Sequence, residues 1–271
     1  GRFRYYLNEI GLSEFRNLVE QRFGPLENDP GSSFSEKPRS FFGINPQKQK
    51  DLYYAGVHIP VGRLSSEDLQ DIATTSMTFG SGEVRLTEDQ NILIIDIPKE
   101  KLSDFKNDNL FKKFSLSPNS ISAGTVACTG KTYCSFAQAS TKENATKIAK
   151  ELEAEIELPE EVKIHWTGCP NSCGQAYMGA IGLTGTKAKN SLGKMVDAFN
   201  ITIGGEQGKN NKIGELKYKG VIVDDLKDRL KDILINNYSA KLKKGTYEEP
   251  ISFLKHSQEL IEKSIKSSQA P

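Results

Sequence analysis

The sequence predicts an α+β protein, and three stretches support this fold class. Residues 52–98 have the pattern of a strand, a helix and two further strands. Residues 141–166 have the pattern of a helix followed by a strand, and residues 198–238 that of two strands followed by a helix. With 271 residues, of which 37% are hydrophobic, the chain is long enough for one large domain or two of ordinary size.

Composition argues against several classes of function. The formal net charge of +1 gives no sign of a basic arm or an acidic tail, so no nucleic-acid partner is expected. No apolar run approaches the roughly 20 residues that cross a bilayer, so no membrane partner is expected either. The 4 cysteines are too sparse for a disulfide-framed secreted scaffold, which favours a reducing compartment and a metal-binding role.

The first expected element is a helix over residues 12–23, where apolar side chains recur at helical spacing. Residues 24–40 follow as a polar loop rich in Pro, Gly and Ser, which is typical of a connection between domains. Residues 1–45 are therefore interpreted as the tail of a preceding domain and a linker. The chain opens with glycine rather than methionine, so we expect it to be part of something longer.

The next segment predicts half of a ferredoxin-like sheet. A strand over residues 52–61 precedes a helix that opens at Ser65. Residues 83–97 then predict a hairpin around a polar turn. This strand, helix and hairpin are assigned to a ferredoxin-like half-domain over residues 46–115.

A helix and a strand frame the cysteine-containing region. Ser140 and Glu143 have the spacing of a capping box, which predicts a helix over residues 141–155. Residues 162–166 then alternate apolar and polar side chains, as a half-buried strand does. Two cysteines follow in the loop beyond this strand, where α/β architectures commonly hold ligands.

The last part of the chain completes the second predicted domain. Two further strands precede a helix over residues 224–238, which we expect Asp224 to cap. An α/β domain is therefore assigned to residues 116–250. Residues 251–271 are interpreted as a C-terminal tail.

The cysteines form two motifs. Cys128 and Cys134 make a Cys-x5-Cys motif, and Cys169 and Cys173 make a Cys-x3-Cys motif 34 residues further on. Four thiolates that converge on one point suit either a structural zinc or an iron–sulfur cluster. The five-residue spacer fits the usual zinc motifs poorly, so an iron–sulfur cluster is favoured over zinc. Disulfides and inert buried thiols are further alternatives, although both motifs lie in glycine-rich loops rather than on apolar faces.

Four stretches carry a family resemblance. The cysteine motifs ACTGKTYC (127–134) and HWTGCPNSCGQ (165–175) resemble the signature of nitrite and sulfite reductases that couple siroheme to a [4Fe–4S] cluster. GVHIPVGRL (56–64) and GEVRLTEDQNIL (82–93) are similar to that family's ferredoxin-like half-domain. The resemblance covers about residues 50–240 and implies that the second domain is an α/β siroheme and [4Fe–4S] domain.

Trp166 and the ACTG opening of the first motif resemble the ferredoxin-dependent nitrite reductases in particular. This resemblance implies a six-electron reduction of nitrite to ammonium with electrons from ferredoxin, in a bacterial cytoplasm or a plastid stroma. Assimilatory sulfite reductase is the nearest alternative. An alternative of another class is a zinc-stabilised binding module with no redox role.

The resemblance also implies roles for individual residues. Cys128, Cys134, Cys169 and Cys173 would hold the cluster, and Cys173 would bridge it to the siroheme iron as an axial ligand. Asn171 would donate to a siroheme carboxylate, and a local turn asparagine is an equally good interpretation. No catalytic residue is assigned.

Within the family's two-half design, this chain matches the second half. The family's main anion-binding arginines and lysines lie in the earlier half, so we expect this chain alone to bind siroheme weakly and to reduce nitrite negligibly. Arg63, Arg85 and Lys131 are only scattered cationic candidates, with a surface role as the default for the two arginines. The three histidines are interpreted as structural: His58, His165 and His256.

Overall fold

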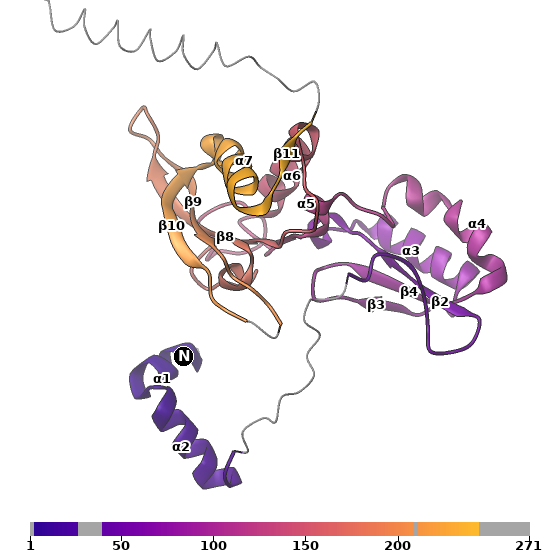
Figure 1. Ribbon diagram of the computed structural model, residues 1–271, viewed down its shortest axis with the longest axis horizontal. Helices are drawn as coiled ribbons and strands as arrows, with labels where there is room; N and C mark the ends of the chain where they lie inside the picture. Colours follow the sequence, from indigo (N-terminus) through magenta and orange to yellow (C-terminus); the bar gives the residue numbers. More distant parts are fainter. Residues whose placement is uncertain (1–2, 27–39, 209–210, 244–271) are drawn as a thin grey trace, which may run out of the picture.

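The structure, a computed structural model, describes residues 3–26, 40–208 and 211–243 (Figure 1). Helices α1 (Phe3–Ile10) and α2 (Leu12–Phe23) come first, and α2 confirms the helix expected there. Most of the expected linker and the whole expected tail over 251–271 lie outside the described residues. Among the described helices, none is long and apolar enough to cross a membrane.

An antiparallel four-stranded sheet forms the first unit, in the order β1-β2-β4-β3. Its strands are β1 (Gly43–Pro46), β2 (Leu52–Val57), β3 (Val84–Leu86) and β4 (Ile92–Pro98). Helices α3 (Ser66–Phe79) and α4 (Leu102–Lys106) pack on one side of this sheet (Figure 1). Helix and sheet share a core that includes Ile72, Ile94 and Phe105. The strand, helix and hairpin expected between residues 52 and 98 are therefore present.

Two details show how local sequence sets this unit. The Ser65 side chain accepts the Asp68 N–H and the Asp68 carboxylate accepts the Ser65 N–H, so a capping box starts α3 where the helix was expected. The sequence does not predict β1, which pairs antiparallel with β2. Strand β1 also straddles the expected boundary between residues 45 and 46, and that division into domains stays a prediction.

A five-stranded sheet forms the second unit, in the order β10-β9-β8-β7-β5. Its strands are β5 (Thr125–Ala127), β7 (Ile164–Thr167), β8 (Ile181–Lys189), β9 (Met195–Ile203) and β10 (Glu215–Ile222). Strands β5, β7 and β8 run parallel to one another, whereas β9 and β10 are antiparallel to their neighbours. The strands expected at the positions of β7, β9 and β10 are present, and β5 and β8 are additional.

Helices α6 (Lys142–Glu155) and α7 (Val223–Tyr238) share one apolar core with this sheet. Trp166 lies in that core and meets Phe199 edge to face, with ring centroids 5.2 Å apart. All four residues of β7 are buried, so the expectation of a half-buried strand is wrong. Because both faces of a central parallel strand are covered, its burial does not alternate.

Two expected helix caps are also wrong. Thr141 is the N-cap of α6 and makes no side-chain cap hydrogen bond, and Ser140 lies one residue too early for the capping box. Glu143 instead bonds to Thr132 and Arg63. Asp224 lies in the first turn of α7 rather than at its cap, where its charge still suits the helix dipole. Both helices are nevertheless present over the expected residues.

Short elements connect these parts. They are η1 (Pro60–Gly62), η2 (Lys99–Lys101), η3 (Asn109–Lys112), α5 (Ser120–Ala123), β6 (Ile156–Glu157), η4 (Ala176–Met178) and β11 (Lys241–Leu242).

The two units are joined by apolar and ionic contacts. Val61 of η1 has a left-handed φ of 47°, which is rare for a β-branched residue, and it packs into the core of the second unit. Lys163, just before β7, pairs with Asp89 in the β3–β4 turn at 2.6 Å. The β3–β4 turn of the antiparallel sheet therefore lies beside the amino end of β7.

Candidate metal centre

The two cysteine motifs follow neighbouring parallel strands. Cys128 comes directly after β5, and Cys169 comes two residues after the end of β7. In the register of this pair, Ala127 lies opposite Trp166. Because the carboxyl ends of parallel strands meet at the same edge of a sheet, the two motifs are brought together there.

Backbone hydrogen bonds join the two motifs directly. The N–H of Cys128 donates to the carbonyl of Trp166 at 3.0 Å. The N–H of Gly168 donates to Cys128 Sγ at 3.1 Å, and the N–H of Gln138 donates to the Gly168 carbonyl at 2.7 Å. An N–H donor stabilises the thiolate form of a cysteine, which is the form that binds metals.

The second motif folds into a tight turn. Ser172 and Gln175 have left-handed φ values of 56° and 55°, and the Gln175 N–H donates to the Ser172 carbonyl. A Cβ on Gly174 would overlap the carbonyl oxygen of Trp166, so the backbone of β7 passes too close for any side chain there. Non-glycine residues in this conformation cost free energy and cluster at functional sites.

The chain's own residues fit an iron–sulfur cluster in their donor chemistry. All four cysteines are free thiols; Cys169 is buried and Cys173 is exposed. They lie on two loops that share a hydrogen bond to sulfur. The described part of the chain holds no group of three or more His, Cys, Asp or Glu side chains already arranged around one ion. The four sulfur donors and the backbone bond to Cys128 Sγ are present in this chain. In the described residues, the four thiols are not gathered around one point.

A cavity of about 370 Å³ lies beside Cys173. Its wall is formed by Glu88, Asp89, Gln90, Val126, His165, Cys173, Gly174, Gln175, Met178 and Gln207. The described wall has two carboxylates and neither lysine nor arginine. The cations that siroheme carboxylates need do not come from these residues.

The structural role expected for His165 stays a prediction. Its side chain lines this cavity and is 2% exposed, with the backbone of Gly174 and Gln175 within interaction distance of the ring. Burial lowers the pKa of His165 below its ordinary 6.5, so the ring is neutral at pH 7 and offers one donor and one acceptor. Trp166 Nε1 and Thr184 Oγ1 are buried without partners. His58, in contrast, contacts the Ser122 carbonyl at 3.2 Å, as a structural histidine does; His256 lies outside the described residues.

Asp197 of β9 holds the first cysteine loop in place. Its carboxylate accepts the Ser140 N–H at 3.0 Å and pairs with Lys131 at 3.2 Å and Lys187 at 2.5 Å. Burial alone would raise the pKa of Asp197, but these hydrogen bonds hold it below its ordinary 3.8. A lone aspartate in a strand carries no sequence signal, and its partners lie up to 66 residues away.

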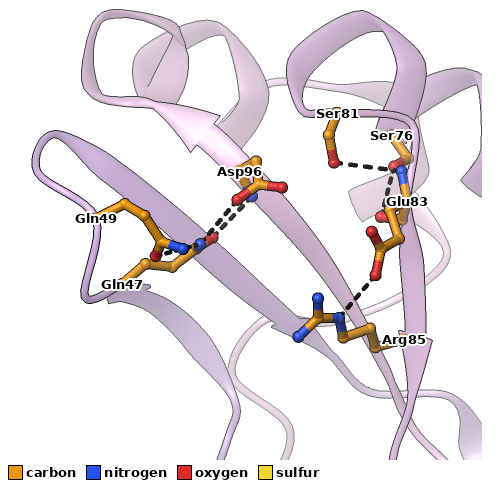
Figure 2. Close-up of polar contacts among 7 residues, drawn as sticks. All are labelled: Gln47, Gln49, Ser76, Ser81, Glu83, Arg85 and Asp96. Atoms are coloured by element: carbon orange, nitrogen blue, oxygen red, sulfur yellow. Dashed lines mark hydrogen bonds and ion pairs between the residues drawn. The ribbon is translucent and has the colours of Figure 1, made fainter.

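The other cationic candidates are also ion-paired. Arg63 pairs with Glu143 at 2.9 Å, and Glu143 in turn accepts the hydroxyl of Thr132 in the first cysteine loop at 2.8 Å. Arg85 pairs with Glu83 on the exposed strand β3, as Figure 2 shows. Arg63 is therefore linked to the cysteine loop, and Arg85 has the expected surface role.

A positively charged groove lies next to Arg63. Its cavity measures about 460 Å³. Five cationic side chains and two carboxylates line it: Arg63, Lys113, Lys142, Lys147, Lys150, Asp68 and Glu143. Burial and the neighbouring Arg63 lower the pKa of Lys142.

Asn171, the remaining sequence candidate, lies half-buried in the turn between Cys169 and Cys173.

Family models and relatives agree with this arrangement. Residues 45–108 match the nitrite/sulfite reductase ferredoxin-like half domain, and residues 122–244 match the nitrite and sulphite reductase 4Fe-4S domain. A ferredoxin–nitrite reductase of Synechococcus elongatus is 43% identical over 89% of this chain. The chloroplastic ferredoxin–nitrite reductase of Arabidopsis thaliana is 38% identical over 88% of it.

The same fold occurs in a solved structure. The Mycobacterium tuberculosis NirA protein matches 91% of this chain with a TM-score of 0.77 and 24% sequence identity, and the chain covers 46% of it. The chain likewise spans only 47% and 42% of the Synechococcus and Arabidopsis enzymes, less than half the length of each. With a half domain and a 4Fe-4S domain that both match in order, the chain belongs to the nitrite/sulfite reductase family.

Proposed function

We propose that this chain is the cofactor-bearing part of a ferredoxin-dependent nitrite reductase, which reduces nitrite to ammonium with six electrons. One observation carries the proposal: the two cysteine motifs leave the carboxyl ends of neighbouring parallel strands and are joined by the Gly168 N–H bond to Cys128 Sγ. The names of the relatives, which are ferredoxin–nitrite reductases, support the choice of substrate and donor.

The proposed ligands of a [4Fe–4S] cluster are Cys128, Cys134, Cys169 and Cys173. Cys173 is also proposed as the axial ligand of the siroheme iron, which is supported by its exposure on the cavity of about 370 Å³. When bound, the two cofactors supply the electron storage and the iron centre that the reaction needs. As a ligand of both groups, Cys173 would couple the cluster to the siroheme electronically.

The protein's own contribution is to hold and protect these groups. The Gly168 N–H donates to Cys128 Sγ and so orients it, and Asp197 restrains the loop between Cys128 and Ser140. Asn171 is proposed to donate to a siroheme carboxylate from the turn of the second motif. The covered face of β7 keeps water from the base of the cluster loops.

The positively charged groove is proposed to receive ferredoxin, the acidic electron donor. Three of its exposed or partly exposed cations are Lys147, Lys150 and Arg63. Through Glu143 and Thr132, the groove adjoins the first cysteine loop. A positive surface beside the electron entry point would steer an acidic protein to it.

The rest of the enzyme is proposed to supply the cations that this chain lacks. We expect residues 1–271 alone to bind siroheme weakly and to reduce nitrite negligibly. The full-length protein should bind siroheme firmly and reduce nitrite. The cavity wall beside Cys173 supports this expectation, because its described residues include carboxylates but no lysine or arginine. A bacterial cytoplasm or a plastid stroma is the proposed location.

The test is the visible and electron-paramagnetic-resonance spectrum of the full-length protein, followed by turnover with nitrite and with sulfite. Siroheme and cluster signals with a higher kcat/KM for nitrite are expected. A higher kcat/KM for sulfite would make the enzyme a sulfite reductase. A colourless zinc protein would overturn the redox proposal. Strong nitrite turnover by the isolated 271-residue chain would contradict the division of labour.

A further inference from the structure

We propose that Gln90 is a positioning residue for Cys128. Its side-chain amide closes the free edge of β5 and holds the backbone from which the first cysteine loop leaves. This inference rests on the proposed function, because it takes Cys128 as a cluster ligand. The residue belongs to the antiparallel unit, so it would let that unit control the geometry of the metal centre in the other.

Two hydrogen bonds carry the inference. Gln90 Nε2 donates to the Ala127 carbonyl at 2.8 Å, and the Ala127 N–H donates to Gln90 Oε1 at 3.1 Å. One side-chain amide thus pairs with both backbone groups of a residue, as a neighbouring strand would. Among the described strands, β5 is the last at its edge of the sheet, so none of them pairs with Ala127 on this side.

The contact lies one residue before the proposed ligand. Ala127 is 0% exposed, so its N–H and C=O have no access to water as an alternative partner. On the other side of the strand, the Cys128 N–H donates to Trp166 of β7. The end of β5 is therefore held from both sides at the point where the chain turns to present Cys128 Sγ to Gly168.

The backbone around Gln90 is shaped to present this side chain. Gln90 has a left-handed φ of 66°, an uncommon conformation for a residue with a side chain. Its N–H donates to the Thr87 carbonyl at 3.1 Å, which closes the turn. Gly62 packs against it so closely that a Cβ at residue 62 would lie 2.7 Å from Gln90 Cβ. Such strain persists where the surrounding contacts hold the residue for a function.

Gln90 also lines the cavity beside Cys173. One side chain therefore lies at the base of the first motif and on the wall next to the second. A change at Gln90 is expected to reach both the ligand geometry and the surroundings of the cluster. Hydrogen bonding and solvent access around the ligands determine how firmly a cluster is held and its spectroscopic properties.

The test compares variants of the full-length protein. Gln90→Gly removes the amide and keeps a residue that tolerates the left-handed φ, so backbone strain does not confuse the result. Gln90→Glu keeps the shape and the acceptor for the Ala127 N–H, but its carboxylate cannot donate to the Ala127 carbonyl. The matched control is Gln47→Gly. Gln47 makes a similar double contact with Asp96, at 2.7 and 2.8 Å, within the antiparallel unit (Figure 2).

Two measurements are made on each variant: the rate at which a chelator removes cluster iron, and the paramagnetic spectrum of the reduced cluster. Gln90→Gly is expected to lose iron on the order of 10-fold faster, with a changed spectrum. Gln90→Glu should fall between it and wild type. Gln47→Gly should keep both wild-type properties even if it lowers the melting temperature as much.

If the Gln90 variants lose iron at the wild-type rate and keep the wild-type spectrum, the positioning role is overturned and the proposed function still stands. An equal change in the Gln47 variant would also overturn the positioning role, because general loosening of the antiparallel unit would then explain the effect. A wild-type protein without any cluster would instead overturn the proposed function itself.

Discussion

The two sheets of this protein differ in the contacts that their polar side chains make. In the antiparallel unit, polar side chains make contacts within the unit: Gln47 pairs with Asp96, Glu83 pairs with Arg85, and the Ser76 hydroxyl donates to the Glu83 backbone carbonyl (Figure 2). Beyond the carboxyl edge of the five-stranded sheet, Cys173 is exposed, and His165 of β7 lines the cavity beside it. The first unit uses these polar side chains for internal contacts and reaches the second unit through Asp89 and Gln90 of its β3–β4 turn, whereas the second unit presents an exposed thiol to a ligand.

Strand direction explains the difference. Antiparallel strands such as β3 and β4 are joined by a tight turn, closed here by the Gln90 N–H bond to the Thr87 carbonyl, so they bring together only residues close in sequence. Parallel strands such as β5 and β7 require long crossovers, so their carboxyl ends gather loops from distant parts of the chain. In this chain, we expect the metal ligands at the carboxyl ends of the parallel strands. We expect the residues that position those ligands, such as Gln90, in the turn between antiparallel strands.

The largest effect is expected at the cysteines, which tests the functional side of this comparison. In the full-length protein, Cys173→Ser should lower nitrite turnover by about 100-fold or more and disturb both siroheme and cluster spectra, because one thiolate would serve both in the proposed arrangement. Cys128→Ser should first damage the cluster signal. Ser81→Ala in the antiparallel unit is the control and should change neither spectrum. A Cys173 variant with a normal siroheme spectrum and full turnover would contradict the bridging role.

The next effect concerns whether the two sheets unfold separately. Phe105 is 0% exposed and meets Phe79 and Phe111 edge to face, so Phe105→Ala should cost about 3–5 kcal/mol. Trp166 is the single tryptophan and reports on the five-stranded unit alone. In urea titrations of the 271-residue chain, we expect the circular-dichroism transition to shift more than the fluorescence transition.

The reciprocal variant is Phe199→Ala, which removes the ring against Trp166 and should shift the fluorescence transition most. Identical shifts by both probes in both variants would show that the sheets unfold as one unit. The contacts of Val61 and Lys163 across the boundary would then dominate their stability.

A moderate effect is expected in the positively charged groove. Combined Lys147→Glu and Lys150→Glu changes should raise the KM for ferredoxin by about 10-fold at low salt and leave kcat nearly unchanged. Lys99→Glu, an exposed change in the antiparallel unit, is the control and should have little effect. The difference between the variants should shrink as salt is added. A KM that does not respond to the groove charges would place ferredoxin elsewhere.

A smaller effect is expected from Asp197. Its pKa is lowered in the folded protein, so its contribution to stability is present above pH 3.8 and is lost as the pH falls through the lower folded value. Asp197→Asn should cost about 1–2 kcal/mol near pH 7 and progressively less below pH 3.8. Urea unfolding of both proteins between pH 7 and pH 2.5 checks this. A difference that stays constant with pH would exclude the carboxylate charge as its source.

The smallest effect is expected at Arg85. Its side chain is 62% exposed and pairs with a Glu83 side chain that is 56% exposed. Arg85→Ala should change the free energy of unfolding by no more than about 0.5 kcal/mol and leave nitrite turnover unchanged. A loss of nitrite turnover in the full-length Arg85→Ala variant would show that Arg85 has a functional role. The antiparallel sheet would then also contribute directly to the site.

Local features of the sequence were sufficient for much of the fold. Helices α3, α6 and α7 were predictable, because each buries one face and repeats its apolar residues accordingly. The β3–β4 hairpin was predictable from its polar turn. The spacing of the cysteines and the glycines around them indicated an iron–sulfur cluster. The family resemblance of the same motifs was confirmed by both domain matches.

Only the tertiary structure decided how these parts meet. Strand β7 is buried on both faces although its sequence alternates apolar and polar residues, because other elements cover the face that carries His165 and Thr167. Gln90 bonds to Ala127 across 37 residues, and Asp197 bonds to Ser140 across 57. Ordinary polar residues acquire such roles only when packing brings distant backbone groups within hydrogen-bond reach. The sequence by itself therefore determined the cysteine motifs and the helices, and the packing of the two sheets decided which other side chains support them.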